Sequence, residues 1–294
     1  MRVSISLTNY SWQTGPAGIG SQLRGVVRAA DAAGVDTVWV PDHLLQADPQ
    51  STPEAEMLEA YTTLGFLAGQ TERVRLGTMV TGVTYRPPAL LVKAVTTVDV
   101  LSGGRAWLGV GAGYHEGEAR GLDLPLPPAA ERLGRLEESL RVAIQLWAGD
   151  ETPFHGSYYR LERPLNSPPA VQQPHPPILV GGMGERKTLR LVAQYANACN
   201  LFDIPDGGKT VTHKLQVLAE HCAVVGRPFG EIEKTISTRF VPDESADQFA
   251  ERCSTLAGLG LDHVVLLGAG PWTVQEVGSL QASIAAVREL PVRS

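Results

Sequence analysis

Residues 178–186, ILVGGMGER, join an apolar stretch to a run of glycines and then to charged side chains. The spacing lacks the last glycine of G-x-G-x-x-G and does not place its glycines where the G-x-x-x-x-G-K-T phosphate loop needs them. We expect a helix to begin at Gly184, with free N–H groups that favour an anion. Arg186 could add a bidentate contact to a phosphate. The sequence therefore predicts an anion site, with a ligand-free glycine turn as the alternative.

Two further pairs of polar residues directly follow apolar stretches. Asp42 and His43 come after residues 36–40, and a histidine can relay protons because its charge changes near pH 6.5. Tyr114 and His115 come soon after another stretch, and both side chains can act as general acids or hydrogen-bond donors. For each pair the alternative is a polar loop without a catalytic role.

Glycines also recur inside two of the apolar stretches. In the first they flank Met79 and Val80, which suggests a bulge, the close approach of a flat ligand, or a strand that simply bends. In the second every other residue is glycine, so one face of the strand would lack side chains. That face could receive a bulky ligand or pack tightly inside the fold. The glycines are Gly77 and Gly82 in the first stretch, and Gly109, Gly111 and Gly113 in the second.

Eight apolar stretches alternate with amphipathic helical patterns along the chain, and such alternation is typical of a parallel sheet. We therefore predict an α/β fold, a single-domain (β/α)8 TIM barrel over residues 1–294, with a doubly wound open sheet as the alternative. Insertions are expected at 112–127 and 150–176. The predicted strands are 3–8, 36–40, 74–81, 106–111, 177–182, 198–202, 235–241 and 263–268, and the predicted helices are 21–34, 54–70, 88–102, 131–149, 184–195, 207–225, 245–259 and 273–289.

Composition narrows the possible functions. The net charge of −6 without a basic run disfavours nucleic acid as a partner. The first residues resemble a strand, not a signal peptide, and no apolar run reaches the ~18 residues of a membrane span. Three widely spaced cysteines fit a reducing compartment, so we expect a cytoplasmic protein. The seven histidines show no metal-binding spacing, which favours chemistry carried by an organic cofactor.

Three segments together resemble the luciferase-like flavin and deazaflavin barrels, above all the actinobacterial branch of oxidoreductases that use the deazaflavin coenzyme F420. The segments are VWVPDHL, RLGTMVTGVTYRPPALLVKAVTTVDVLSGGRAWLGVGAGY and PILVGGMGERKTLRLVAQYANACNLF. The resemblance runs along nearly the whole chain. It implies a TIM barrel, a homodimer, and hydride transfer between F420 and a small organic substrate.

The resemblance also assigns roles to residues. His43 would relay a proton or steady developing charge, together with Asp42, and Tyr114 and His115 are weaker catalytic candidates. The peptide bond between Met79 and Val80 would be a non-proline cis bond behind the deazaflavin ring. The residues implied to bind the cofactor are Asp42, His43, Met79, Val80, Thr81, Gly111, Ala112, Gly113, Gly181, Gly182, Met183, Gly184, Glu185 and Arg186.

The sequence departs from two branches of this family. Tyr114 stands where the glucose-6-phosphate dehydrogenase branch has a glutamate, so sugar-phosphate oxidation is not implied. The long late insertion of luciferase proper is missing, so light emission is not implied either. Residues 150–176, with aromatic side chains at Phe154, Tyr158 and Tyr159, could form a lid over the pocket.

Three other functions remain open at this stage. One is a monooxygenase of the same fold that uses reduced FMN, since FMN also carries a phosphate on a ribityl chain. Another is a non-catalytic flavin- or deazaflavin-binding protein. The third is a metal-free barrel that acts on phosphorylated metabolites without a redox cofactor.

Overall fold

Eight parallel strands close into a barrel in the computed structural model, which describes residues 1–48 and 51–288. Strand β1 pairs with both β11 and β2, and β3 pairs with β5, so the ring has no open edge. Short strand β4 continues the path of β3 along β5. The strands are β1 (Arg2–Ser6), β2 (Thr37–Val40), β3 (Arg75–Thr78), β4 (Thr81–Gly82), β5 (Ala106–Gly111), β8 (Ile178–Gly181), β9 (Ala198–Phe202), β10 (Glu233–Arg239) and β11 (His263–Leu267).

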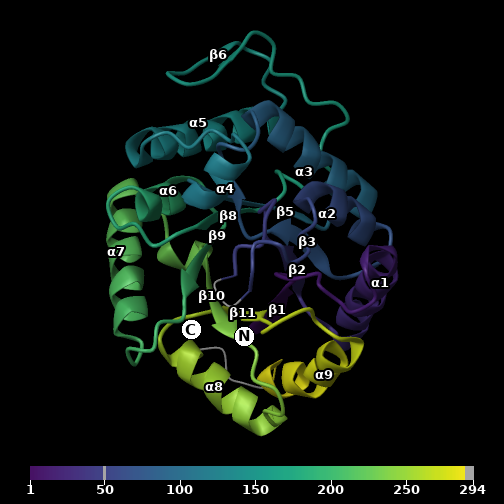
Figure 1. Ribbon diagram of the computed structural model, residues 1–294. Helices are drawn as coiled ribbons and strands as arrows, with labels where there is room; N and C mark the ends of the chain where they lie inside the picture. Colours follow the sequence, from purple (N-terminus) through teal and green to yellow (C-terminus); the bar gives the residue numbers. More distant parts are fainter. Residues whose placement is uncertain (49–50, 289–294) are drawn as a thin grey trace.

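Helices surround this barrel on its outside (Figure 1). The described helices are α1 (Pro16–Ala33), α2 (Ala60–Ala68), α3 (Pro88–Ser102), α4 (Glu116–Gly121), α5 (Ala129–Trp147), α6 (Thr188–Tyr195), α7 (Lys209–Val225), α8 (Ala246–Gly258) and α9 (Val274–Arg288). The predicted (β/α)8 barrel is confirmed, and the open-sheet alternative is wrong because the ends of the sheet pair with each other. Residue 289 of the last predicted helix, and the final residues of the predicted domain, lie outside the described residues.

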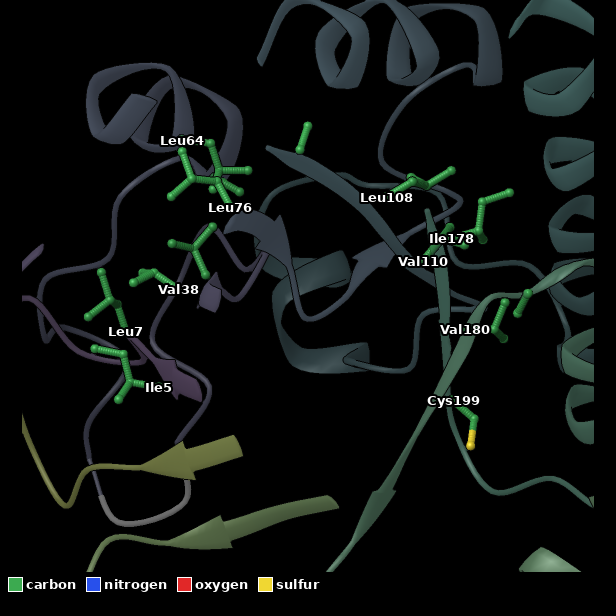
Figure 2. Close-up of a cluster of buried hydrophobic side chains, with 14 of the residues drawn as sticks. Ile5, Leu7, Val38, Leu64, Leu76, Leu108, Val110, Ile178, Val180 and Cys199 are labelled. Atoms are coloured by element: carbon green, nitrogen blue, oxygen red, sulfur yellow. The ribbon is translucent and has the colours of Figure 1, made fainter. Parts of the chain in front are cut away.

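The core has two layers, because successive side chains of a strand point to opposite faces. Side chains on the outer face of the barrel pack under the helices, and Figure 2 shows Leu64 of α2 beside Leu76 of β3. Inside the barrel, Trp39, Trp107 and Leu179 form a second cluster with Ala198 and Val265. The inner layer closes the barrel with side chains, so that ligands have access only at its ends.

Charged groups cluster where the strands begin. His263 faces Glu233 across 2.6 Å, and the same carboxylate accepts a hydrogen bond from Arg2. A cavity of about 610 Å³ lies beside this cluster, lined in part by Arg2, Asp36 and Arg75. Barrel enzymes hold their active sites at the opposite end, where the strands finish. A functional site is therefore expected at the carboxyl ends of the strands.

The two predicted insertions contain short helices or strands of their own. The first contains α4, and the second contains an antiparallel hairpin of β6 (Phe154–His155) and β7 (Arg160–Leu161). The hairpin extends beyond α5 at the periphery of the molecule (Figure 1). The carboxylate of Glu138 in α5 accepts backbone N–H groups from residues 157, 158 and 159, which fixes the hairpin to that helix.

Helix α2 is shorter than the predicted 54–70. It begins at Ala60, because the carboxylate of Glu59 accepts the N–H of Thr62 at 2.6 Å and caps the helix there. Residues 54–59 instead form an irregular segment, and residues 69–70 form a turn. The apolar spacing located the helix correctly, and the capping contact determined where it starts.

Replacing Gly109 with alanine is expected to destabilise the protein by about 3 kcal/mol. An added Cβ would lie 1.7 Å from the carbonyl oxygen of Thr78, a backbone atom of the neighbouring strand that cannot move aside. Urea unfolding followed by tryptophan fluorescence measures the change. Gly278→Ala is the control: no described atom lies within 4 Å of its added Cβ, so this variant should gain about 0.5–1 kcal/mol. Equal stability of Gly109→Ala and the native protein would contradict the packing described here.

Candidate functional site

The candidate site lies where β2, β4, β5 and β8 end, and Val80 is at its centre. The Met79–Val80 peptide bond is cis, as the family resemblance implied. The side chain of Val80 lies between two strands: an added Cβ at Gly111 or Gly181 would lie 2.9 Å from its methyl carbons. The glycines of β5 and β8 therefore make room for this bulge. Of the two interpretations of the β5 glycines, tight packing holds for Gly109 and Gly111.

Asp42 follows β2 at the mouth of the barrel, which is the end where the strands finish. Its side chain is buried there and held by hydrogen bonds. Its carboxylate receives two hydrogen bonds from the guanidinium of Arg86, one of them 3.0 Å long. Arg86 also donates to Glu59 at 2.6 Å and lies over the ring of Tyr61. Burial raises the pKa of Asp42 above its usual range, although Arg86 acts in the opposite direction. Asp42 therefore forms part of the wall that supports the mouth.

Thr81 belongs to the same buried wall. Its hydroxyl bonds to the hydroxyl of Tyr61 at 2.8 Å and to that of Thr78 at 3.2 Å. Thr78 in turn donates to the carbonyl of Gly109 at 2.7 Å. This chain of hydrogen bonds connects α2 to β5 across the bulge and holds the backbone around Val80 in position.

His43 is bound to a residue that the sequence did not single out. Its Nδ1 lies 2.9 Å from Oε2 of Glu118, a side chain only 1% exposed. The other oxygen, Oε1, accepts the N–H groups of Leu44 and Leu45, the second at 2.9 Å. The hydroxyl of Tyr85 also donates to Oε2. One carboxylate thus ties the loop after β2 to α4, which follows β5.

The carboxyl group of Glu118 is strongly acidic despite its burial. Burial by itself would raise its pKa, but hydrogen bonds from His43, Tyr85 and the N–H of Leu45 outweigh it and lower the pKa to about 2. Glu118 is therefore an anion at neutral pH. The same contact and burial raise the pKa of the Tyr85 hydroxyl, which stays protonated and continues to donate.

Tyr114 and His115 meet His43 at the rim. The rings of His43 and His115 lie 5.5 Å apart, and the ring of Tyr114 lies 5.7 Å from that of His43, both in edge-on arrangements. The ring of Tyr114 is largely exposed, and partial burial together with the charge of Glu118 raises the pKa of its hydroxyl. His115 caps α4: its Nδ1 accepts the N–H of Glu118 at 3.0 Å. The structure thus brings together the predicted residues that follow β2 and β5.

The glycine-rich loop after β8 differs from the expected helix start. Helix α6 begins at Thr188, not at Gly184, because residues 185–187 form a turn and the carbonyl of Gly184 accepts the more distant N–H of Leu189. Gly182 has a φ of 115°, a left-handed conformation that favours glycine. Within the described residues, the N–H groups of residues 183–186 donate no hydrogen bond. Four consecutive free donors therefore line this loop.

The two charged side chains Glu185 and Arg186 of the loop differ in their contacts. Glu185 faces α7, where its carboxylate contacts Nζ of Lys214 at 2.5 Å and Nε2 of His213 at 3.0 Å, and its carbonyl lies 2.7 Å from His221. These contacts lower the pKa of Glu185. Arg186 is exposed and makes no ion pair in the described part of the chain. The free N–H groups and Arg186 suit a phosphate, whereas the carboxylate of Glu185 anchors the loop.

The predicted lid residues lie against α5. Phe154 is buried under Arg141, and the rings of Tyr158 and Tyr159 lie beside Arg135. No ring contact among the described residues joins them to His43 or Tyr114. A role as a lid stays a prediction.

Sequence reasoning missed Glu118, Tyr85 and Arg86. The sequence did contain one signal for Glu118, which lies three residues after His115. A residue that caps the start of a helix contacts the position three residues later. No local pattern could reveal that its carboxylate binds His43, 75 residues away. Within the described ranges, no group of His, Cys, Asp and Glu could hold a metal ion, and no helix could cross a membrane.

The chain is thus a (β/α)8 barrel with unpaired N–H groups and polar side chains at the carboxyl ends of its described strands. The model of the luciferase-like monooxygenase family matches residues 1–283, and the chain belongs to that family. An F420-dependent glucose-6-phosphate dehydrogenase from Kineococcus radiotolerans is 31% identical over 241 residues, which cover 79% of this chain and 67% of that protein.

Two solved structures share the fold. An F420-dependent secondary alcohol dehydrogenase in complex with an F420-acetone adduct matches with a TM-score of 0.82 at 18% identity, covering 98% of this chain and 99% of that one. A monooxygenase from Streptomyces bottropensis matches with the same TM-score at 17% identity and the same coverage. At these identities the likeness supports the barrel fold alone.

In Glu118→Gln, the free energy of unfolding is expected to fall less at acidic pH than in the native protein. Because the folded-state pKa is about 2 and the usual value is 4.5, ionised Glu118 stabilises the folded protein above pH 4.5, and this contribution disappears as the pH falls toward 2. Between pH 7 and about 3, the native protein should lose about 2 kcal/mol more unfolding free energy than the variant. Chemical denaturation at several pH values measures this. The exposed neighbour Glu116, changed to Gln, should leave the profile as in the native protein, and an identical result for both variants would contradict the assignment.

Proposed function

We propose that this protein is an F420-dependent oxidoreductase that transfers a hydride between the deazaflavin and a small organic substrate. The observation that carries the proposal is the loop of residues 183–186, whose N–H groups donate no hydrogen bond within the described residues and which follows Gly181 at the Val80 bulge. Family membership and the similarity to F420-dependent relatives support the same cofactor. The family resemblance also supports a homodimer, and the exposure of Leu90 and Leu101 on α3, 55% and 62%, offers an apolar contact surface.

The residues present fit such a cofactor. The N–H groups of residues 183–186 and the guanidinium of Arg186 would hold its phosphate. Gly181 and Gly182 would place this loop, since Gly181 makes room for Val80 and Gly182 takes a left-handed conformation. Met79, Val80 and Thr81 would support the ring from behind, and Gly111, Ala112 and Gly113 would border it. When bound, the deazaflavin supplies a carbon that accepts or gives a hydride.

This chain's own side chains would manage the accompanying proton and charge. His43 would take or return a proton at Nε2, because its Nδ1 is held by Glu118. Asp42 would act through the wall it forms with Arg86, and Tyr114 and His115 would border the substrate. The proposal does not extend to glucose 6-phosphate, because Tyr114 replaces the glutamate that the resemblance places in that branch.

We also propose a cytoplasmic location. Cys199, Cys222 and Cys253 are all buried free thiols, a state that fits a reducing compartment.

Arg186→Met is expected to weaken F420 binding by a factor of about ten to one hundred, since a charged hydrogen bond contributes about 1.5–3 kcal/mol. Quenching of deazaflavin fluorescence on titration measures the affinity. Lys187→Met, in the same turn and also exposed, is the matched control and should bind as the native protein does. Native binding of FMN with little affinity for F420 would instead favour the reduced-FMN monooxygenase, and binding without turnover of any substrate would favour a binding protein.

His43→Ala is expected to lower the rate of hydride transfer by a factor of about 100 or more, because a positioned proton-transfer group contributes on that order. Turnover is followed by deazaflavin absorbance over a panel of alcohols, aldehydes, ketones and enones. His155→Ala, in the outer hairpin, should retain native turnover. If His43→Ala kept both native turnover and native cofactor affinity, the role given to His43 would be wrong.

A further inference from the structure

Glu118 contacts two histidines of the mouth through two different groups. Its side-chain Oε2 faces Nδ1 of His43 at 2.9 Å. Its backbone nitrogen faces Nδ1 of His115 at 3.0 Å. The two imidazole rings lie 5.5 Å apart, so one residue sets the hydrogen bonding of both members of an adjacent pair.

The chemistry of each contact fixes where the ring proton must be. An ionised carboxylate only accepts hydrogen bonds, so Nδ1 of His43 must carry a proton. A backbone N–H only donates, so Nδ1 of His115 must present a lone pair. A neutral imidazole has one proton on its two nitrogens, and each contact therefore determines the state of the opposite nitrogen as well.

We propose that Glu118 is a positioning residue that holds His43 and His115 in opposite tautomers. Neutral His43 then has a bare Nε2 that accepts a hydrogen bond or a proton. Neutral His115 has an Nε2–H that donates. Two adjacent histidines at the mouth thus offer a ligand a hydrogen-bond acceptor, Nε2 of His43, and a donor, Nε2–H of His115.

Three features of the site support this role. Glu118 is only 1% exposed, so water does not compete effectively for its carboxylate. The carboxylate is oriented by further donors, the N–H groups of Leu44 and Leu45 on Oε1 and the hydroxyl of Tyr85 on Oε2. Nε2 of neither His43 nor His115 has a hydrogen-bond partner among the described residues, and neither atom is buried without one. Both atoms remain available to a ligand.

A substitution can separate the two contacts. In Glu118→Gln, the side-chain carbonyl is expected to stay on Leu44 and Leu45, because their N–H groups require an acceptor. The amide NH₂ then replaces Oε2 and donates to Nδ1 of His43, so that the proton of this ring moves to Nε2. The backbone N–H of residue 118 is unchanged, so His115 should keep its tautomer and serve as an internal control.

The experiment is nitrogen–proton correlation NMR of the imidazole rings at about pH 9, above the usual range of histidine ionisation. It uses the full chain without added cofactor, with His43→Ala and His115→Ala to assign the signals. In the native protein we expect a protonated Nδ1 for His43 and a protonated Nε2 for His115. In Glu118→Gln, the ring proton of His43 should move from Nδ1 to Nε2, whereas that of His115 should stay on Nε2. Tyr85→Phe, which removes a donor but retains the carboxylate, should leave both patterns unchanged.

Several results would overturn the proposal. These are the same tautomer for both rings in the native protein, protons on both nitrogens of His43, or an unchanged His43 in a folded Glu118→Gln protein. If Glu118→Gln fails to fold, the tautomers seen in the spectra of the native protein and of Tyr85→Phe still support or overturn the proposal. The measurement does not involve F420, so failure of the proposed function leaves this test unaffected.

Discussion

The mouth of the barrel depends on glycines at three positions of the neighbouring strands β5 and β8, where a side chain would not fit. An added Cβ at Gly111 or Gly181 would lie 2.9 Å from Val80, and one at Gly109 would meet the backbone of Thr78. Because this space is filled by the segment that joins β3 to β4, the bulge is held from both sides. The Val80 bulge thus provides a fixed centre. The loop of residues 181–186 and the residues after β5 lie around it.

Two buried carboxylates support this centre in different ways. Asp42 receives its hydrogen bonds from one guanidinium, and burial still raises its pKa. Glu118 receives them from an imidazole, a phenol and backbone N–H groups, which together lower its pKa. Burial disfavours the charged form of both groups, and only at Glu118 do the hydrogen bonds outweigh it, so Glu118 is the more stable anion. Asp42 fastens the wall to Arg86 and α2, whereas Glu118 connects two loops that carry the histidines.

Much of the fold could be predicted from the sequence, because the alternation of strands and helices is a local pattern. The same pattern placed Asp42 and His43 at the end of β2, and the family resemblance added the cis bond before Val80. The start of α6 could not be predicted, since it depends on a turn at residues 185–187. There the N–H of Leu189 donates to the carbonyl of Gly184, five residues earlier. The partner of His43 could not be predicted either, because only the closed barrel brings Glu118 to it.

The hairpin of β6 and β7 is attached to α5 mainly through backbone atoms. Its turn is held by one carboxylate, that of Glu138, which receives three successive N–H groups on the outer surface of α5. This attachment needs the backbone of residues 157–159 and a glycine at 156, because an added Cβ there would overlap the carboxylate of Glu138. A fluorescent label or surface tether at His155, whose side chain is exposed, would leave the attachment in place, whereas any side chain at residue 156 would disrupt it.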